Sequence, residues 1–568
     1  MPPDTNLAAL FQEATHRHAG KAFHFPALGR TLTYEELAHG TRRVAQALRA
    51  RGVQAGERVG LLFSTSPEAL IAFWGVLSAS AVAVPLPQPT PTSALTAYVS
   101  RLAHILRDGR IRYVLVGDEF EAHAGFLLEA SGLDIVALEV GTLLNEAASL
   151  EPTPLGPAGP SQLALVQYTS GSTSDPKGVA LTHANLLAGI RAISEGVRLK
   201  ADDVNGQWLP LHHDMGLIGM LAGTLAGTTH YLWPPASFIR APGRWLSEFA
   251  RHRATAYAGP NFSYASMLAK VSSEELRTLD LSAWRIAFNG ADTIDPACIE
   301  AFLQRFGPAG FVPSAMFPVY GLAEATLAVT FPALGSTPFI EWVDREALSN
   351  EGLARDTPRG SASARGVVCV GAPVLEHALR IASLEGAPLG PRQVGEIQVR
   401  GPAVMSAYLG RSPEESGITA DGWLRTGDLG YLSGGRLFVT GRVKELIIIR
   451  GAKYYPQDVE AVVCRLPGLY RRKAIAFTDD SVPHGRMVVL AEIEDPPPAP
   501  CEDIAGAIRE AVAGEVGVRA LAVYLLRPRS LARTTSGKYQ RLLMRERLRA
   551  GALEESLIHP PSEAARAN

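Results

Sequence analysis

A short segment rich in glycine, serine and threonine, Tyr168–Gly178, has the composition of a loop that binds phosphate. It follows Leu163–Val166, an apolar run that predicts a buried strand. Backbone N–H groups and hydroxyls at a strand end can point at phosphate oxygens, and Lys177 adds a positive charge for the outer phosphates. The candidate phosphate-binding residues are Thr169, Ser170, Gly171, Ser172, Thr173 and Lys177. The order differs from a Walker loop, because no serine or threonine directly follows the lysine. A flexible linker is the alternative for such a composition, but the buried strand and the internal Pro-Lys-Gly favour phosphate binding.

The frame that must position this loop is predicted to be a pair of parallel sheets. Continuous apolar runs at Arg58–Phe63, Ala81–Val84 and Tyr113–Val116 alternate with helical patterns such as Pro67–Ser78. Parallel sheets that are covered by helices on both faces have this sequence pattern. We therefore expect an α/β fold in which a large N-terminal domain contains two parallel-type sheets with helices.

The pattern changes in the second half of the chain. Short strands with tight turns, at Val367–Val370, Gly395–Val399 and Leu437–Val439, indicate a small β-barrel or an antiparallel sheet. The last part of the chain contains further strands, a helix at Pro456–Cys464 and a basic helix at Lys538–Arg549. We expect a small β-barrel within the large domain, followed by a small α+β domain.

The bulk composition narrows the class of protein. A chain of 568 residues exceeds one hydrophobic core, so we expect two or more domains. The formal net charge of −2 gives no support for a nucleic-acid partner. The four cysteines are far apart and form no metal-binding or disulfide pattern: Cys298, Cys369, Cys464 and Cys501. The N-terminus lacks a signal-peptide pattern, and the apolar stretch Ala69–Val84 is shorter than the about 20 residues that a membrane span requires. We expect a cytoplasmic protein with no membrane span.

Further short motifs follow the phosphate-binding segment in a definite order. They are Leu209–Gly216 (LPLHHDMG), Phe288–Asp292 (FNGAD), Tyr320–Glu324 (YGLAE), Trp423–Asp428 (WLRTGD), Gly441–Glu445 (GRVKE) and Arg533–Lys538 (RTTSGK). In this order the motifs resemble those of the adenylate-forming superfamily, which includes acyl-CoA synthetases, peptide-synthetase adenylation domains and luciferases. The resemblance extends over almost the whole chain. It implies activation of a carboxylic acid with ATP and Mg²⁺, with acyl-AMP as the intermediate and AMP as a product.

The resemblance also implies roles for the polar residues of these motifs. Lys538, which follows a Ser-Gly turn, would hold the substrate carboxylate and the α-phosphate. Glu324 would bind magnesium, which prefers carboxylate and phosphate oxygens. Tyr320 would stack on adenine, Asp428 would accept hydrogen bonds from the ribose hydroxyls, and Arg442 would contact ribose or phosphate. Further nucleotide-binding candidates are Asn289, Gly290, Ala291, Asp292 and Gly321. Taken singly, these types are equally typical of surface cations, turn residues, acids at helix starts and core aromatics.

Within the superfamily, the sequences of several motifs resemble those of the fatty acyl-AMP ligases. The segments are His213–Gly216, Gly259–Tyr264, Leu279–Trp284 and Gly321–Thr326, with Ala323 where many members have threonine. This resemblance implies a fatty acid substrate and transfer of the acyl group to the phosphopantetheine thiol of an acyl carrier protein. The alternatives are a fatty acyl-CoA synthetase that uses free coenzyme A, an amino-acid or aryl-acid adenylating enzyme, and an inactive nucleotide-binding relative. The presence of Glu324, Asp428 and Lys538 argues against the last of these.

The same resemblance implies that the motif around His213 lines the acyl pocket near the reacting carboxylate, with His213 as a catalytic candidate. The candidate pocket residues are His213, Asp214, Met215, Gly216, Ile218, Phe262 and Tyr264. An acid such as Asp214 could bind an amino group, but its His-Asp-Met-Gly context favours a structural role. The apolar members suit an alkyl chain, whose burial gains about 0.8 kcal/mol per methylene, or they form ordinary core.

Two segments are expected to control the second half of the reaction. By resemblance, Lys444 is the hinge between a large domain of residues 1–443 and a small, mobile domain of residues 444–568. The polar stretch 332–365 lies where fatty acyl-AMP ligases carry an insertion that restrains the small domain and disfavours coenzyme A; a generic surface loop is the alternative. Within it, Phe339–Leu348 is predicted to form a strand and then a helix start. Only 30 residues follow Lys538, so we expect the carrier protein to act in trans and the chain to be a monomer.

Overall fold

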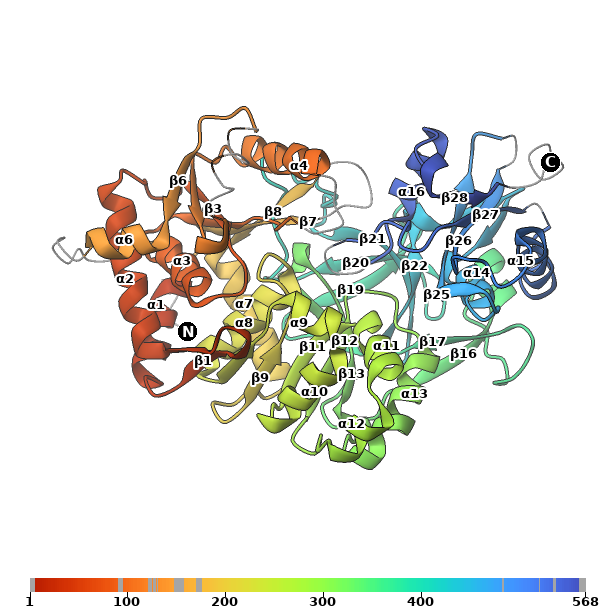
Figure 1. The fold of residues 1–568 in the computed structure, drawn as a ribbon, viewed down its shortest axis with the longest axis horizontal. Coiled ribbons are helices and arrows are strands. Elements are labelled where there is room, and N and C mark those ends of the chain that lie inside the picture. Colours follow the sequence, from red (N-terminus) through yellow and green to blue (C-terminus); the bar gives the residue numbers. More distant parts are fainter. Residues whose placement is uncertain are drawn as a thin grey trace.

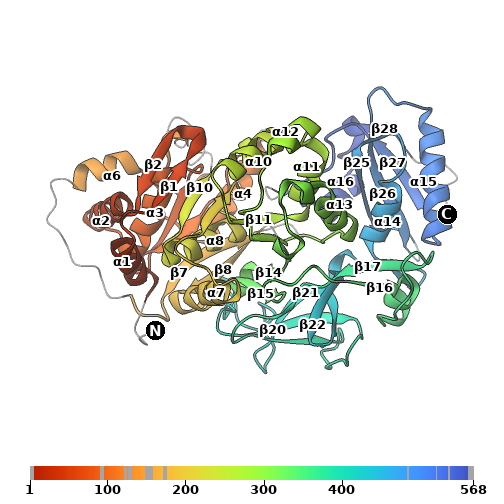
Figure 2. The same ribbon diagram turned by 90° about the horizontal axis from the view of Figure 1, so that it is seen from below.

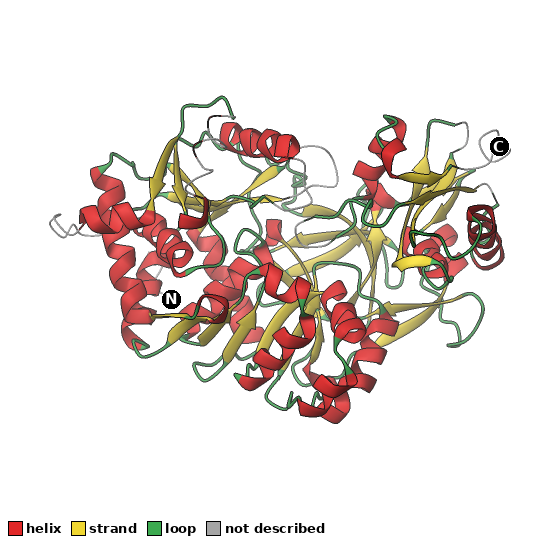
Figure 3. Cartoon of the chain, viewed as in Figure 1, coloured by secondary structure: helices red, strands yellow, loops and turns green. Residues whose placement is uncertain are grey.

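The computed structural model describes residues 6–89, 95–120, 125, 129, 131–147, 158–169, 176–482, 485–519, 521–534 and 538–560. Two large, mostly parallel sheets lie in the N-terminal part, residues 6–443, and a smaller sheet lies in the C-terminal segment, residues 444–560 (Figure 1). Helices cover the sheets, as Figure 3 shows. The expected α/β fold with parallel-type sheets is confirmed.

The first large sheet has the strand order β13-β12-β11-β9-β10-β1-β2 within the described residues. All neighbouring pairs are parallel except β1 with β2. The strands are β1 (Ala22–Phe25), β2 (Arg30–Thr33), β9 (Val204–Gln207), β10 (Thr229–Leu232), β11 (Ala256–Pro260), β12 (Ile286–Gly290) and β13 (Met316–Pro318).

The second large sheet has the order β6-β5-β3-β4-β7-β8, again counted over the described residues. It is parallel except for the final pair, β7 with β8, which brackets the predicted phosphate loop. The strands are β3 (Arg58–Leu62), β4 (Val82–Pro85), β5 (Tyr113–Val116), β6 (Val136–Glu139), β7 (Leu163–Thr169) and β8 (Lys177–Thr182). The four strands that the apolar runs predicted, β3, β4, β5 and β7, are therefore confirmed.

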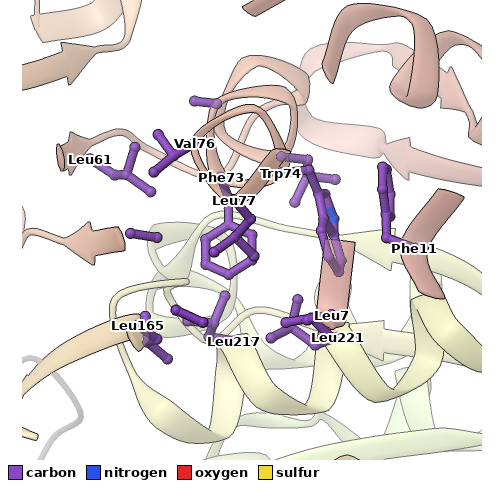
Figure 4. Packing of buried hydrophobic residues seen from close by; sticks show 14 of the residues in the cluster. Leu7, Phe11, Leu61, Phe73, Trp74, Val76, Leu77, Leu165, Leu217 and Leu221 are labelled. Atoms are coloured by element: carbon purple, nitrogen blue, oxygen red, sulfur yellow. The ribbon is translucent and has the colours of Figure 1, made fainter. Parts of the chain in front are cut away.

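Helices pack between and around these two sheets. They are α1 (Leu7–Arg17), α2 (Tyr34–Ala50), α3 (Pro67–Ser78), α4 (Leu95–Asp108), α6 (Val140–Glu146), α7 (His183–Gly196), α8 (Asp214–Ala226), α9 (Pro235–Arg240), α10 (Pro242–Arg251), α11 (Asn261–Lys270), α12 (Ser273–Thr278) and α13 (Pro296–Phe306). Helix α3 begins at the Ser66 cap and is apolar around its whole circumference, so nearly all of it is buried. Trp74 stacks on Phe11 with ring centroids 4.0 Å apart (Figure 4), which joins α3 to α1. In the described residues no helix has both the length and the apolar character that crossing a membrane requires.

Antiparallel strands follow β13, the last strand of the first large sheet in the chain. They form sheets of three, two and four strands in the described residues, with the orders β14-β15-β18, β16-β17 and β19-β20-β21-β22. The strands are β14 (Tyr320–Leu322), β15 (Leu327–Phe331), β16 (Ile340–Asp344), β17 (Ala364–Val368), β18 (Ala372–Pro373), β19 (Ala378–Ala382), β20 (Gly395–Arg400), β21 (Leu424–Ser433) and β22 (Arg436–Arg442). Isolated bridges such as Cys369 with Phe438 connect the sheets, but their edges do not close. The expected β-barrel is thus corrected to separate antiparallel sheets, because closure depends on long-range register that local strand patterns do not specify.

The C-terminal segment has its own hydrophobic cores. Its four-stranded sheet, β25-β26-β27-β28, and the hairpin β23-β24 pack against three helices (Figure 2). The elements are β23 (Ile447–Ile449), β24 (Ala452–Tyr454), α14 (Pro456–Val463), β25 (Leu469–Asp479), β26 (Arg486–Ile493), α15 (Cys501–Glu515), β27 (Leu521–Leu526), α16 (Arg541–Arg549) and β28 (Leu557–His559). The basic helix predicted from Lys538 begins at Arg541, because Lys538 lies in the preceding loop, where its N–H donates to Thr534 Oγ1 at 3.1 Å.

Candidate active site

A cleft with a volume of ≈2400 Å³ lies between the N-terminal part and the C-terminal segment. Its walls include the ends of β7 and β12, the antiparallel sheets, and the loop before α16. Both described ends of the predicted phosphate loop, Thr169 and Lys177, line this cleft and pair across the β7–β8 ladder. Four predicted loop residues, Ser170, Gly171, Ser172 and Thr173, lie outside the described residues.

Three predicted nucleotide-binding residues form one hydrogen-bonded group in the cleft. Tyr320 donates its hydroxyl proton to Asp428 Oδ2 at 2.8 Å, and Arg442 Nε lies 2.9 Å from Asp428 Oδ1. Asp428 and Arg442 face each other across the β21–β22 ladder, which fixes their separation. The Asp428 carboxylate raises the pKa of the Arg442 guanidinium, and burial raises the pKa of Tyr320. The group therefore presents a carboxylate, a cation and an aromatic ring in fixed positions.

Close packing of the backbone holds Tyr320 in this place. Strand β14 runs against β15 at Gly321, where an added Cβ would lie 1.7 Å from the Leu327 carbonyl oxygen. Only glycine fits there, so the Tyr-Gly pair of the motif has a steric explanation.

Glu324 and Lys177 are linked through Tyr408, a residue that the sequence analysis did not identify. The Tyr408 hydroxyl donates to Glu324 Oε1 at 2.7 Å, and Lys177 Nζ lies 5.0 Å from the centroid of the Tyr408 ring. Burial raises the pKa of Glu324, and burial lowers that of Lys177. No spacing in the sequence indicates Tyr408, because its partner Glu324 is 84 residues away.

Lys538 reaches the same cleft from the C-terminal segment. Burial lowers the pKa of Lys538, and the Arg442 guanidinium lowers it further. The carboxylates of Asp214, Asp292 and Asp428 raise the pKa of Lys538 and so act in the opposite direction. Asp428, Arg442 and Lys538 of the last three motifs thus lie at one site with residues of the earlier motifs.

The segment Asn289–Asp292 lies at the carboxyl end of β12, but only its last residues reach the cleft. Ala291, at φ +63°, and Asp292 line the cleft, whereas Asn289 and Gly290 are buried behind it. Asn289 Nδ2 donates to Asn261 Oδ1 at 3.4 Å, which ties β12 to α11. Asn289 and Gly290 are therefore arranged to support the strand end, and Ala291 and Asp292 to contact a ligand.

His213 caps helix α8 at the edge of the cleft. Its Nδ1 lies 2.7 Å from Asp214 Oδ1, and the Met215 N–H donates to the same oxygen at 2.7 Å. Burial raises the pKa of Asp214, but His213 and Lys538 outweigh this effect and hold the pKa at about 2. Neighbouring His212 is buried, which lowers its pKa to about 3. Both carboxylate and imidazole are thus fixed by local contacts.

The predicted acyl-pocket residues divide into two groups. His213, Asp214, Met215 and Phe262 line the cleft. Ile218 and Tyr264 do not, because they pack in the two large hydrophobic cores, and the Tyr264 hydroxyl donates to the Phe288 carbonyl at 2.7 Å. Gly216 also lies outside the cleft lining; an added Cβ there would lie 2.5 Å from the Pro210 carbonyl oxygen, so glycine permits the turn into α8.

On the cleft-facing side of α11, the sequence analysis identified Phe262 but missed the alanines. Phe262, Ala265 and Ala269 lie at positions i, i+3 and i+7 of this helix and all line the cleft. Helical periodicity could have found this face, because the three residues share one side of a helix. The small alanines leave room for an apolar ligand beside Phe262.

The hinge candidate Lys444 and the polar stretch 332–365, which is the candidate insertion, lie at the junction of the two parts. Lys444 lines the cleft within the 3₁₀ turn Val443–Glu445. The predicted strand in the insertion is confirmed as β16, which pairs with β17, and the predicted helix start is a turn of π-helix at Ala347–Glu351. The insertion contacts the C-terminal segment: Arg345 Nη1 donates to the Glu515 carbonyl oxygen at 2.8 Å, and Arg365 Nε lies 3.1 Å from Asp458 Oδ1.

The fold and the cleft define an adenylate-forming type of architecture, and comparison with known proteins identifies the family. The family model for AMP-binding enzymes matches residues 11–409, and the chain belongs to this family. The chain is 34% identical over 581 aligned residues to a medium-chain-fatty-acid–[acyl-carrier-protein] ligase of Moorena producens, covering 98% of this chain and 97% of that protein.

Solved structures agree with this assignment. A structure from a study of fatty acyl-adenylate ligases of E. coli and L. pneumophila superposes with a TM-score of 0.88 at 32% identity, covering 97% of this chain and 98% of that one. The fatty acyl-adenylate ligase of L. pneumophila in complex with acyl adenylate and pyrophosphate has a TM-score of 0.72 at 29% identity, covering 98% and 97%.

The family implies magnesium, and Glu324 fits a magnesium ligand. Its carboxylate lines the cleft, and burial raises its pKa, so a nearby cation would offset the cost of its charge. No group of three or more His, Cys, Asp or Glu side chains forms a metal cluster among the described residues. A single carboxylate suits magnesium, which keeps several waters and takes its other ligands from substrate phosphates.

Proposed function

We propose that this chain is a fatty acyl-AMP ligase that serves an acyl carrier protein. The enzyme would activate a fatty acid with ATP, release pyrophosphate, and pass the acyl group to the phosphopantetheine thiol of a separate carrier protein. The observation that carries the proposal is the position of Lys538, which joins Asp214, Asp428 and Arg442 in one cleft. The names of the aligned ligases supply the substrate and the acceptor.

In the first step, a carboxylate oxygen of the fatty acid attacks the α-phosphorus of ATP. The bond from that phosphorus to the bridging oxygen breaks, and pyrophosphate leaves with the bonding electrons. Negative charge on the phosphate oxygens is stabilised by fixed cations, for which Lys538, Arg442 and Lys177 are the candidates. Asp428 would accept hydrogen bonds from the ribose hydroxyls, and Tyr320 would present its ring to adenine.

Bound magnesium would supply further positive charge to the phosphates, and Glu324 would hold it. The remaining nucleotide contacts are assigned to Ala291 and Asp292 at the end of β12, and to the loop between Thr169 and Lys177. Asn289, Gly290 and Gly321 would support these contacts through the backbone.

The acyl chain would lie along α11 beside Phe262, with its carboxylate near His213. Each buried methylene contributes about 0.8 kcal/mol, so an apolar wall favours longer chains over short acids. The Asp214 carboxylate is held by His213 and the Met215 N–H, which favours a structural role over binding of a substrate amino group.

For the second step we infer a large domain of residues 1–443, a small mobile domain of residues 444–568, and a hinge at Lys444. Two hydrophobic clusters consist entirely of residues beyond Lys444, beginning at Ile447 of β23. This supports the boundary. The insertion would restrain the small domain through Arg345 and Arg365 and so disfavour coenzyme A. A monomeric state and a cytoplasmic location stay predictions.

The test is an acceptor experiment after activation. Hydroxamate trapping across fatty, aryl and amino acids should detect adenylates of fatty acids. Acyl transfer from the same reaction should then be efficient with holo acyl carrier protein and weak with free coenzyme A. Activation confined to amino acids, or equal transfer to coenzyme A, would contradict the proposal.

A further inference from the structure

The outer edge of the cleft carries cations that have no acidic partner. Arg471, Arg472 and Arg533 of the C-terminal segment and Lys270 at the end of α11 are exposed and line the cleft, and we name them the basic rim. Over the described part of the chain, no carboxylate lies within 4.0 Å of their nitrogen atoms. Lys270 Nζ donates only to the Ile239 carbonyl at 3.0 Å.

Several cations elsewhere along the cleft are paired with carboxylates. Arg442 pairs with Asp428 at 2.9 Å, and Arg541 Nη2 pairs with Glu460 Oε2 at 2.7 Å. Even the neighbours of the rim follow this pattern, since Lys473 Nζ lies 3.5 Å from Glu492 Oε2. The basic rim is therefore a group of exposed cations at the cleft edge that have no acidic partner among the described residues, although the whole chain has a net charge of −2.

The two sides of the rim repel each other. Burial lowers the pKa of Lys270, and the Arg471 guanidinium lowers it further from across the cleft. Both residues line the cleft, Lys270 at the end of α11 and Arg471 in β25. Like charges held together without a counter-charge raise the energy of the free protein, and an anion between them would remove this repulsion.

A strained bulge brings two rim arginines to the same side. In the β25–β26 ladder, Leu469 pairs with Ile493 and the next pair is Ala474 with Ala491, so Tyr470–Lys473 faces only Glu492. Arg471 and Arg472 have φ of +51° and +53°, a backbone region that arginine rarely adopts. In a regular strand these neighbours would point to opposite faces, whereas here both line the cleft.

From these observations we propose that the basic rim is the docking surface for an acyl carrier protein, binding its anionic face and the phosphodiester that attaches the pantetheine arm. This inference rests on the proposed function, in which the arm must reach the acyl-adenylate; the carrier protein would dock before rotation at Lys444, while Arg471, Arg472 and Arg533 line the cleft as they do here. The arm carries one phosphodiester anion at its attachment point, so it would pass an exposed cationic edge while its neutral, thiol-bearing end moves inward. Guanidinium groups suit this role because they bind phosphate oxygens in pairs.

The test separates docking from chemistry by variants of the full chain. In the double variant Arg471→Gly with Arg472→Gly, both charges are removed by a residue that accepts positive φ, so the fold is preserved. The matched control is Arg450→Gly, an exposed arginine of the same segment at φ +50° that does not line the cleft. Acyl-adenylate is formed first, and transfer is then measured to holo carrier protein and to free pantetheine, a neutral thiol.

The double variant should lower kcat/KM for the carrier protein by about tenfold at low salt, mostly through KM, and should weaken its salt dependence. Transfer to pantetheine and pyrophosphate exchange should remain unchanged, and Arg450→Gly should behave as wild type. Unchanged transfer to the carrier protein would overturn the rim proposal alone, as would a parallel loss with pantetheine. A parallel loss of pyrophosphate exchange would also overturn it, because the rim would then serve the nucleotide. Absence of adenylate in the wild type would contradict the proposed function itself, and the rim proposal with it.

Discussion

Replacement of Lys538 by alanine should separate the two half-reactions. The ammonium group lines the cleft, where the carboxylates of Asp214, Asp292 and Asp428 favour its charge and burial and Arg442 disfavour it. It is the single lysine assigned to the cleft from the C-terminal loop, and Lys538→Ala removes one positive charge without removing a core side chain.

The expected size of the effect follows from Coulomb's law. A unit charge 4 Å from a charged phosphate oxygen contributes about 4 kcal/mol at an effective dielectric constant of about 20. Since 1.36 kcal/mol corresponds to a tenfold change in rate, this is an upper value of about 10³. Lys538 is partly exposed, so solvent screens part of this energy, and we expect a loss of about 10²–10³ in adenylate formation. Folding stability should change by less than about 0.5 kcal/mol, as for most surface positions.

The assay compares pyrophosphate exchange with acyl transfer from purified acyl-adenylate. Lys538→Ala should lose exchange and retain transfer, and Lys538→Arg should recover little, because a planar guanidinium does not replace a compact ammonium. The matched control is Lys453→Ala, an exposed lysine of β24 outside the cleft lining. If exchange in Lys538→Ala remains within a few-fold of wild type, the charge argument is refuted.

Three further perturbations test other parts of the structure. Tyr408→Phe removes the hydroxyl that holds Glu324 and should raise the magnesium concentration needed for half-maximal pyrophosphate exchange, measured by titration; an unchanged requirement would contradict the linkage. Asp203 is buried, which raises its pKa, but hydrogen bonds led by that from Arg285 hold the pKa below its usual value. Asp203→Asn should therefore cost about 2–4 kcal/mol in urea unfolding at pH 7, and the difference should shrink as the pH falls below 3.8, toward the depressed folded pKa; a constant difference would refute the assignment. Arg345→Ala breaks the bond from the insertion to the C-terminal segment and should raise acyl-CoA yield while leaving adenylate formation intact, and equal yields would argue against restraint.

The choice of a point variant over deletion of residues 332–365 comes from the structure. Val343 and Leu348 of the insertion are fully buried in a cluster with Tyr431 and Phe438. Deletion would open a cavity in this core, and its effect on coenzyme A use would be confused with unfolding.

The sequence predicted the elements that depend on local pattern. Continuous apolar runs identified β3, β4, β5 and β7, because strands buried on both faces need apolar side chains at every position. The order of motifs also brought Lys538 and Asp428 to one site, although no local rule connects residues 110 positions apart.

The predictions from the sequence that failed have a common physical cause. Ile218 and Tyr264 were assigned to the acyl pocket because they are apolar and near a motif, but a cleft wall and a core use the same residue types. Tyr408 was missed because its function depends on a contact with Glu324 that only the tertiary structure creates. The barrel was wrong for a related reason, since closure requires the register of distant strands.

The proposed hinge at Lys444 divides the contacts of the C-terminal segment into two kinds. Contacts within the segment can rotate with it, whereas contacts with the N-terminal part must break. Arg541, three residues after the catalytic lysine candidate, pairs with Glu445 at 2.8 Å and with Glu460 at 2.7 Å, and all three lie on the C-terminal side of Lys444. Rotation at Lys444 would therefore carry this buried network intact, with the loop that bears Lys538. The pair Arg365–Asp458 crosses the boundary and is almost completely buried, and separating such a pair without new partners costs about 3–5 kcal/mol. The structure thus resists rotation at this pair and at Tyr455, which is buried in a cluster with Tyr431 and Phe438 of the N-terminal part. Product binding or the arriving carrier protein must supply that energy for the second step to proceed.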